Sequence, residues 1–426
     1  MILLAAVLGL GVGRIAHGEK ANVKVLFSKR LSANGSTRAT AYAMSNKIIT
    51  AKGKTFVAWL DLVADVRMAT YDIAKRQWSD TELVGQGTDN HSGPAITMDS
   101  EGYLYIAYGP HVGPFQFRKS ERPCDVTAWE PVQRFGVNAT YPSLVCGPDD
   151  TLHCTYRGGK RPLRVMYQRK PKDGKWSRPR EVVHSAAPGG YTQYGNALAV
   201  AKDGTLHLAF HIYDMHPAAG KAAGYLRSRD GGGTWETADG REVKLPATPK
   251  TKCFVEQGPK LDVRIGNVVL DGAGRPWITV IHLEPGARTA LLWHREGARW
   301  RPVDLLPFVR KRLGRLAIGQ AAATFDRGGT LYVAAAVLKP GVSKAFGHPS
   351  KEVVLLTSVD RGRTFRAVPI STPDPKLPNW LPSIERPYGP RPVGVPSFIY
   401  THGNIGTYGD CKSGKPTEVF FVRLTK

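Results

Sequence analysis

The sequence lacks the patterns that predict helical or membrane-spanning proteins. No stretch of useful length repeats apolar residues at the helical period. After the N-terminus no apolar run reaches the ~20 residues that a membrane-spanning helix needs. These absences exclude a helical bundle and argue against membrane insertion. The core must therefore be built from strands, and 42% hydrophobic residues in 426 suffice for a large one.

Acidic residues are also scarce. The chain has 35 Asp and Glu against 59 Lys and Arg, which gives a formal net charge of +24. Such an excess favours an anionic partner, for example nucleic acid, acidic lipid or acidic polysaccharide. The basic residues are scattered rather than gathered in one tail or helix. We therefore expect an anionic polysaccharide as partner, and no nucleic acid.

Cysteine is rare, and its spacing is uninformative. The chain has five cysteines and no CxxC pair, so the pattern predicts neither a metal site nor a disulfide framework. Buried free thiols are the commoner state of cysteines on inner strands. Two alternatives stay open. One is a bridge between Cys146 and Cys154 on the two arms of one hairpin; the other is a bridge or metal site that uses Cys253 and Cys411 in loops.

What the sequence does contain is a repeat. Six times an apolar run, a turn with Gly or Asp and a second apolar run recur, at spacings of about 50 to 70 residues. Two β-branched or aromatic runs joined by a tight turn predict a β-hairpin, and repeats of this length are typical of propeller blades. The hairpins are expected at residues 47–59, 95–108, 142–156, 196–210, 267–280 and 320–334.

Each hairpin is followed by a second pair of short strands. Two of the outer turns, at 228–235 and 358–365, carry the Asp-box pattern Ser-x-Asp-x-Gly-x-Thr-aromatic. Its Asp and Thr can hydrogen-bond the turn backbone, and its Gly supplies a positive φ. The sequence thus predicts an all-β, seven-bladed β-propeller with four antiparallel strands per blade. The last blade would combine 397–400 and 419–422 with a closing strand at 23–27.

The N-terminus has the character of an export signal. Residues 2–12 are apolar, and small residues at 16–18 offer a cleavage site. We expect residues 1–18 to be a signal peptide and 19–426 to form a single domain. The protein would then be secreted or periplasmic, and we expect a monomer.

Polar residues gather where strands of neighbouring blades reach the same face. The first strand of a blade begins, and the second ends, at one mouth of the central channel. His91 and His111 take these two places in one blade, and Tyr141 and Arg157 take them in the next. We expect these four residues to be catalytic. Further candidates at this mouth would bind substrate: Tyr191, Tyr194, Asn196, His211, Tyr213 and Arg264.

These residue types favour one chemistry. No two carboxylates stand at equivalent positions, which argues against the usual glycosidase pair, and no nucleophile elbow occurs. His, Tyr and Arg suit removal of a carbon-bound proton beside a carboxylate. Arg would neutralise a uronate, His or an ionised Tyr would remove the C5 proton, and Tyr or His would protonate the departing O4. This predicts β-elimination, a reaction that requires no cofactor.

Four motifs carry a family resemblance. Residues 89–95 (Asp-Asn-His-Ser-Gly-Pro-Ala), 139–142, 156–159 and 194–198 together resemble the BNR-repeat family. Within it they are most similar to the seven-bladed ulvan lyases of polysaccharide lyase families 24 and 25. The resemblance implies cleavage of a uronate-containing, sulfated, ulvan-like polysaccharide. It also implies His91 or His111 as base, Tyr141 as acid and Arg157 as neutraliser.

Some alternatives remain beside this interpretation. The resemblance allows for a structural calcium or zinc ion, although the sequence shows no ligand cluster for it. The Asp boxes also suit a sialidase-like exo-glycoside hydrolase. That enzyme would need an arginine cluster, for which Arg157, Arg264 and Arg315 are available, and a Tyr-Glu couple, which is lacking. A noncatalytic glycan-binding propeller is the third class.

Overall fold

The computed structural model describes residues 23–184, 195–212, 221–258, 261–284, 288–314, 316–342, 346–403 and 415–426. The expected signal peptide lies outside them. The described chain is all-β, with a short 3₁₀ turn at Leu62–Ala64 and one α-helix, α1 (Leu306–Leu313), which packs against β25 (Arg366–Pro369). None of its helices is both long and apolar enough to cross a membrane.

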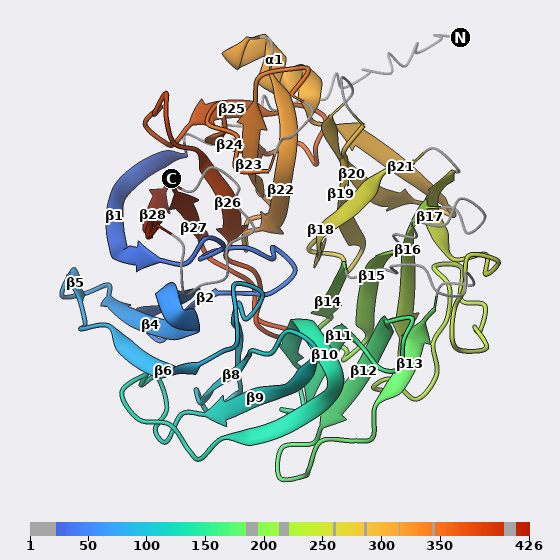
Figure 1. The fold of residues 1–426 in the computed structure, drawn as a ribbon. Helices are drawn as coiled ribbons and strands as arrows, with labels where there is room; N and C mark the ends of the chain where they lie inside the picture. The colour runs from blue at the N-terminus through green and yellow to red at the C-terminus, as the bar shows by residue number, and fades with distance from the viewer. Residues whose placement is uncertain are drawn as a thin grey trace, which may run out of the picture.

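The described strands form six antiparallel sheets, arranged around a common centre in Figure 1. The first half of the chain contributes β1 (Lys24–Gly35), β2 (Ile48–Ala51), β3 (Lys54–Leu60), β4 (Asp65–Asp72), β5 (Gln77–Trp78), β6 (Glu82–Gln86), β7 (Ala95–Met98), β8 (Leu104–Tyr108), β9 (Gly113–Lys119), β10 (Gln133–Cys146), β11 (Leu152–Gly158), β12 (Arg164–Lys170) and β13 (Arg180–Val183). The second half contributes β14 (Asn196–Val200), β15 (Leu206–Ile212), β16 (Lys221–Ser228), β17 (Phe254–Gly258), β18 (Val263–Leu270), β19 (Pro276–His282), β20 (Thr289–Glu296), β21 (Arg299–Asp304), β22 (Ala317–Phe325), β23 (Leu331–Leu338), β24 (Glu352–Ser358), β25, β26 (Asn379–Ile384), β27 (Ser397–His402) and β28 (Thr417–Thr425).

One of these sheets is two repeats joined by a long strand. It has the order β13-β12-β11-β10-β9-β8-β7, and the first part of β10 pairs with β9 while its last part pairs with β11. The other sheets are β2 to β6, β14 to β17, β18 to β21, β22 to β25, and β26 to β28 with β1. The six expected hairpins are confirmed as β2–β3, β7–β8, β10–β11, β14–β15, β18–β19 and β22–β23.

The first strands of successive repeats pack against one another. Contacts run from β2 to β7, to β10, to β14, to β18, to β22 and to β26. The strands β8, β15 and β23 are buried along their whole length. Burial on both faces explains why the second arm of each hairpin is a continuous apolar run rather than an alternating one.

The two ends of the chain meet in one sheet. As expected, a strand from the N-terminus, β1, pairs with β28, and β28 pairs with β27. Phe421 of β28 is fully buried there and contacts the rings of Phe27 in β1, at 5.9 Å between centroids, and Trp78 in β5, at 4.9 Å. This aromatic cluster therefore stabilises the contact between the two termini.

Phe421→Ala should lower the free energy of unfolding by about 3 to 5 kcal/mol, because it opens a cavity in a well-packed core. Denaturant titration measures the loss. The neighbouring Phe420, whose side chain is partly exposed on the other face of β28, provides the control, and Phe420→Ala should cost less. Equal losses from the two variants would contradict a special contribution of the contact between the termini.

Two outer turns have the same hydrogen bonds. In 228–235 the Ser228 hydroxyl donates to Asp230 at 2.8 Å, and Asp230 accepts from the Thr234 backbone N–H and hydroxyl. Ser358, Asp360 and Thr364 repeat this network. The aspartate binds the backbone of its own turn, so these motifs stabilise turns and offer no catalytic carboxylate.

The four described cysteines are free, the state that is commoner for cysteines on inner strands. Cys124, Cys146, Cys154 and Cys253 are free thiols, so the bridge between Cys146 and Cys154 does not form. The register explains this, because Cys146 faces Leu152 and Cys154 faces Leu144 across the hairpin. Cys411 lies outside the described residues.

Candidate active site

The four expected catalytic residues meet at one end of the inner strands. His91 lies in the loop before β7, His111 follows β8, Tyr141 lies in β10 and Arg157 in β11. The rings of His91 and His111 stack with centroids 3.9 Å apart, and the ring of Tyr141 lies 6.0 Å from that of His91. The Arg157 guanidinium lies 4.7 Å from the centre of the Tyr141 ring. The sequence prediction that these loops converge is thus reproduced in the structure.

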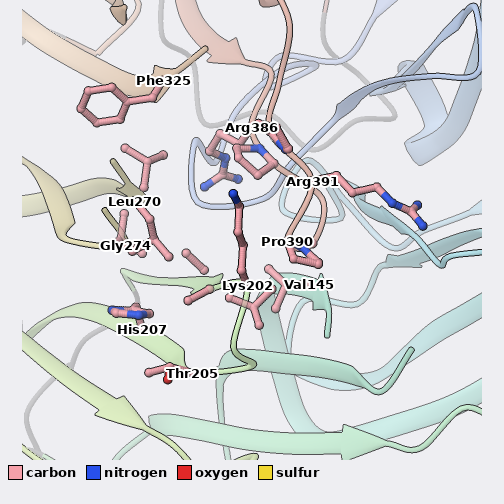
Figure 2. Close-up of a pocket in the computed structure, with 18 of the residues that line it drawn as sticks. Val145, Lys202, Thr205, His207, Leu270, Gly274, Phe325, Arg386, Pro390 and Arg391 are labelled. Carbon is pink, nitrogen blue, oxygen red and sulfur yellow. The ribbon is translucent and has the colours of Figure 1, made fainter. Parts of the chain in front are cut away.

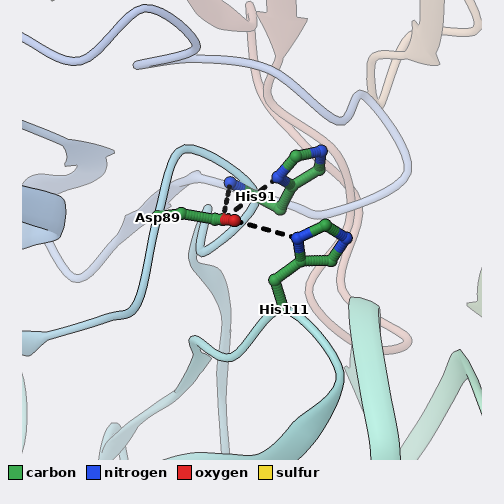
Figure 3. A group of neighbouring side chains, drawn as sticks. All are labelled: Asp89, His91 and His111. Atoms are coloured by element: carbon green, nitrogen blue, oxygen red, sulfur yellow. Dashed lines mark hydrogen bonds and ion pairs between the residues drawn. The ribbon is translucent and has the colours of Figure 1, made fainter. Parts of the chain in front are cut away.

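Asp89 holds the two histidines together (Figure 3). Its Oδ1 lies 3.0 Å from Nδ1 of His91 and its Oδ2 lies 2.9 Å from Nδ1 of His111. The backbone N–H of His91 also donates to Oδ1, at 2.7 Å. Burial alone would raise the pKa of Asp89, but the hydrogen bonds from His111 and His91 lower it far below its ordinary value. Asp89 is therefore ionised and accepts an Nδ1–H from each imidazole.

Arg38 fixes the state of His91. The Arg38 Nη1 lies 2.7 Å from the His91 Nε2, and an arginine can only donate. His91 therefore accepts at Nε2 and donates at Nδ1, so it is neutral with both ring nitrogens engaged. Burial and then the nearby positive charge of Arg38 lower the pKa of His91 to about 4.

His111 differs in its second nitrogen. Its side chain is 33% exposed, and within the described part of the chain its Nε2 has no hydrogen-bond partner. In the neutral form of His111 that donates its Nδ1–H to Asp89, Nε2 carries the lone pair. The carboxylate therefore orients the His111 ring so that its Nε2 lies on the exposed side.

Tyr141 adopts a strained backbone conformation. Its φ is +60°, at a register shift between Thr140 and Ser143 in the pairing of β10 with β11. Tyr42, whose ring lies 4.8 Å from that of Tyr141, and Val112, next to His111, also have positive φ, at 70° and 65°. Non-glycine residues with positive φ tend to cluster at functional sites, where the surrounding structure stabilises the strain.

Arg157 is more buried than its expected position at an open mouth suggests. Only 1% of it is exposed, its Nη2 donates to the Thr140 hydroxyl at 3.0 Å, and it lies against the Tyr141 ring. The positive charge of Arg157 therefore lies behind the Tyr141 ring, and its electrostatic field reaches the site from there. No pattern in the sequence indicates this burial.

The expected substrate-binding residues divide into three groups. Tyr191, Tyr194 and Tyr213 lie outside the described residues. Asn196 and His211 are almost completely buried: the Asn196 side chain donates to the Tyr141 carbonyl, and the His211 Nδ1 accepts from the Ile265 N–H. They therefore support the backbone beneath the mouth. Arg264, at the start of β18, is exposed and stays a candidate for binding substrate.

Three residues of the site were not among the expected site residues, and two of them have no signal in the sequence. Arg38 and Tyr42 come from the loop between β1 and β2, where no motif marks them, and the Arg38 Nη1 also donates to the Tyr42 hydroxyl at 2.9 Å. Asp89 lies within the 89–95 motif. Its position two residues before His91, together with a second histidine after β8, is the pattern that could have identified it.

Asp89, His91 and His111 are also the single group of three potential metal ligands in the described part of the chain, with ligand atoms within 4.8 Å of one another. A metal there would have to displace both Nδ1 protons, and the Arg38 cation occupies the other nitrogen of His91. The donor chemistry thus fits a hydrogen-bonded triad better than a calcium or zinc site.

Four histidines make the folded protein sensitive to acid. Burial is the main reason that the pKa of His91, His153 and His207 is lowered to about 4 and that of His211 to about 3, from 6.5. His153 and His207 are buried strand residues, and Nδ1 of each lies 2.7 Å from a tyrosine hydroxyl. The unfolded chain takes up these protons near pH 6.5, whereas the folded chain does so only near pH 3 to 4.

The stabilisation from these neutral histidines is therefore complete above pH 6.5 and lost as the pH falls from about 6.5 to about 3. A histidine whose pKa is one pH unit lower in the folded chain contributes about 1.4 kcal/mol, so protonating all four should lower the free energy of unfolding by several kcal/mol. Denaturant titrations at neutral and acidic pH measure this difference. Equal stability at both would contradict the neutral state of these side chains.

The sequence was compared with models of protein families and with the sequences of known proteins, and both comparisons found relatives. Residues 54–305 match the model described as a BNR repeat-containing family member. An ulvan lyase of Nonlabens ulvanivorans is 22% identical over 298 residues, 58% of this chain and 62% of that protein. An ulvan lyase of Pseudoalteromonas sp. (strain PLSV) is 23% identical over 292 residues, 58% of this chain and 60% of that protein. The chain thus spans less than two thirds of the curated relatives that it matches.

Solved structures share the fold. A polysaccharide lyase named PL25 ulvan lyase, bound to -[GlcA(1-4)Rha3S]-, superposes with a TM-score of 0.70 at 14% identity, over 92% of this chain and 94% of that one. Another polysaccharide lyase superposes with a TM-score of 0.60 at 13% identity, over 94% and 99%. At these identities the likeness concerns the fold alone.

Proposed function

Because this chain belongs to the BNR repeat-containing family, we propose that it is a polysaccharide lyase. It would cleave a uronate-containing, sulfated, ulvan-like polysaccharide by β-elimination. The observation that carries this proposal is the dyad of Asp89 and His111 beside Tyr141, a base and a candidate acid that face one site. The similarity to ulvan lyases and the +24 charge support an anionic polysaccharide as the substrate.

We further propose a seven-bladed β-propeller as the architecture. If the sheet from β7 to β13 is divided at β10, the described strands fall into seven groups of about four. Their inner strands contact one another in sequence, and β1 completes the last group. A closed ring of seven blades explains how loops far apart in the sequence reach one mouth.

The proposed reaction has three coupled changes. His111 Nε2 removes the proton on C5 of the uronate, and the electron pair forms a double bond between C4 and C5. The C4–O4 bond breaks, and the phenol of Tyr141 donates its proton to O4. Positive charge from Arg157 and Arg38 neutralises the uronate carboxylate and so stabilises the developing carbanion.

His111 suits the role of base better than His91. Both nitrogens of His91 are engaged, by Asp89 and by Arg38, whereas the His111 Nε2 is exposed. In this assignment His91 is a positioning residue that holds Asp89 and Arg38. The resemblance by itself left the choice between them open.

The two alternative functions have less support. Within the described residues the Asp-box aspartates bind their own turns, and no carboxylate pair faces the site beside Tyr141. A sialidase-like hydrolase would need such an acid. A noncatalytic propeller would not require an imidazole oriented by a carboxylate next to a tyrosine with a strained backbone. Export, a monomeric state and independence of a cofactor remain predictions.

An ultraviolet assay tests the proposal. The purified protein would be incubated with ulvan and, in parallel, with uronate polysaccharides that carry no sulfate and with a neutral polysaccharide. Elimination creates an unsaturated uronate that absorbs in the ultraviolet, whereas hydrolysis creates reducing ends without this absorbance. Reducing ends alone would favour the hydrolase, and binding without either product would favour the noncatalytic propeller.

A further inference from the structure

A cavity lies at the opposite end of the inner strands from the candidate active site. It has a volume of about 670 Å³ and is lined by the turns between first and second strands of three sheets, residues 201–205, 271–274 and 325–327, and by 386–392. β10 links the two places, because Tyr141 belongs to the active site and Val145 lines the cavity. Ser143 and Leu144, which lie between these two residues, also line the cavity, so its wall begins two residues from Tyr141.

The cavity has an excess of positive charge. The basic residues that line it are Lys202, Arg227, Arg229, Arg327, Arg386 and Arg391. Glu236 pairs with Arg227 and Arg229, whereas none of the other four forms an ion pair with a carboxylate among the residues that the structure describes. The acidic residues of the lining are engaged elsewhere: Asp271 with Arg275, Asp326 with Lys426, and Asp203 with the Thr205 backbone.

Arg386 is the most unusual of these cations. It is only 6% exposed, and its Nη2 donates a hydrogen bond to the Met44 carbonyl, at 2.8 Å. Burial lowers the pKa of Arg386 to about 10, and the pKa of the neighbouring buried Lys47 is also lowered, by burial and by the charge of Arg386. Burying a charge without a counter-charge is costly, so an anion at this position would stabilise the fold.

Lys202 adds an exposed cation on the same side. It lies in the exposed turn after β14, and Figure 2 shows its side chain and that of Arg386 directed into the same part of the cavity. Two like charges that face one space repel each other unless an anion lies between them. The apolar side chains of Val145, Leu270 and Phe325 complete the wall and would suit the faces of sugar rings.

We propose that this cavity is a second binding site, distinct from the active site, for an acidic oligosaccharide. Arg386 and Lys202 would bind one of its sulfate or carboxylate groups, and the apolar wall would contact the sugar. A guanidinium matches the geometry of an oxyanion, and an ammonium adds a point charge. A bare ion would fill little of this volume, which lies within the range of roughly 300 to 1,000 Å³ that is usual for small-molecule sites.

Calorimetric titration tests the proposal in the Arg157→Ala protein, so that the active site contributes little. The probes are a sulfated glucuronate-rhamnose tetrasaccharide and, separately, sodium sulfate. We expect about one equivalent of tetrasaccharide to bind, and Lys202→Glu to weaken its binding at least ~10-fold. Lys75→Glu is the matched control, because Lys75 is an exposed turn lysine outside the cavity, and it should bind as the parent does.

Arg386→Gln should also weaken binding, and thermal melting shows whether it folds. If the Arg386→Gln variant does not fold, the Lys202→Glu variant still tests the proposal, because Lys202 is exposed. Absence of tetrasaccharide binding, or equal affinity of the Lys202→Glu and Lys75→Glu proteins, would overturn the proposal. Binding of sulfate alone would overturn the assignment to an oligosaccharide. The readout is binding, so it does not depend on whether the protein is a lyase.

Discussion

Replacing Tyr141 by phenylalanine should lower kcat for ulvan cleavage by about 10²- to 10⁴-fold, the usual contribution of a general acid. The phenol is the proposed donor of the proton to O4, while its ring still packs against Tyr42 and Arg157 in the variant. KM should change little, because the loss concerns the transition state rather than the bound substrate. Ultraviolet absorbance of the unsaturated product gives the rate.

The matched control for this variant is Tyr156→Phe. Tyr156 lies in β11 of the same sheet, is fully buried and donates its hydroxyl to Gln168 at 2.6 Å, outside the site. It should keep its activity and lose only some stability. If Tyr141→Phe is as active as Tyr156→Phe, the acid is another group, and the role of Tyr141 would be limited to packing.

His111→Gln should lower kcat by a similar factor of about 10²- to 10⁴-fold, because it removes the proposed base. Glutamine can still donate an N–H to Asp89, so the loop after β8 should keep its position. His91→Gln is the informative comparison, since His91 is equally close to Asp89 but has no open nitrogen. We expect it to retain at least ~10-fold more activity than His111→Gln.

The relative activities of the His91→Gln and His111→Gln variants decide which histidine is the base. Greater loss in His91→Gln than in His111→Gln would move the base to His91 and would mean that Arg38 releases it when substrate binds. Circular dichroism and melting temperature show whether each variant is folded. Equal, full activity in both would remove the dyad from the mechanism.

Much of the fold could be predicted because it depends on local patterns. The hairpin at 95–108 needs only two apolar runs and a turn, and the structure has it as β7 and β8. A strand from the N-terminus was also expected to close the last repeat, and β1 pairs with β28. By contrast, the long β10, which joins two repeats in one sheet, has no signature, since each half reads as an ordinary strand.

The site was predictable only in part, for a related reason. Repetition places His91, His111, Tyr141 and Arg157 at equivalent ends of strands, so their convergence follows from topology. The reach of Arg38 from the loop after β1 to the His91 Nε2 does not, because it joins segments 53 residues apart without any motif. The same holds for the cavity around Arg386, whose walls come from several different sheets.

The sequence by itself determined the strand repeat, the excess of positive charge and the set of imidazole, phenol and guanidinium groups at one end of the strands. Only the tertiary structure decided which nitrogen of each histidine is engaged, how deeply Arg157 is buried and which cations lack a counter-charge. The physical reason is that patterning acts along a strand over a few residues. Protonation, burial and charge depend on neighbours that the fold brings together from distant parts of the chain.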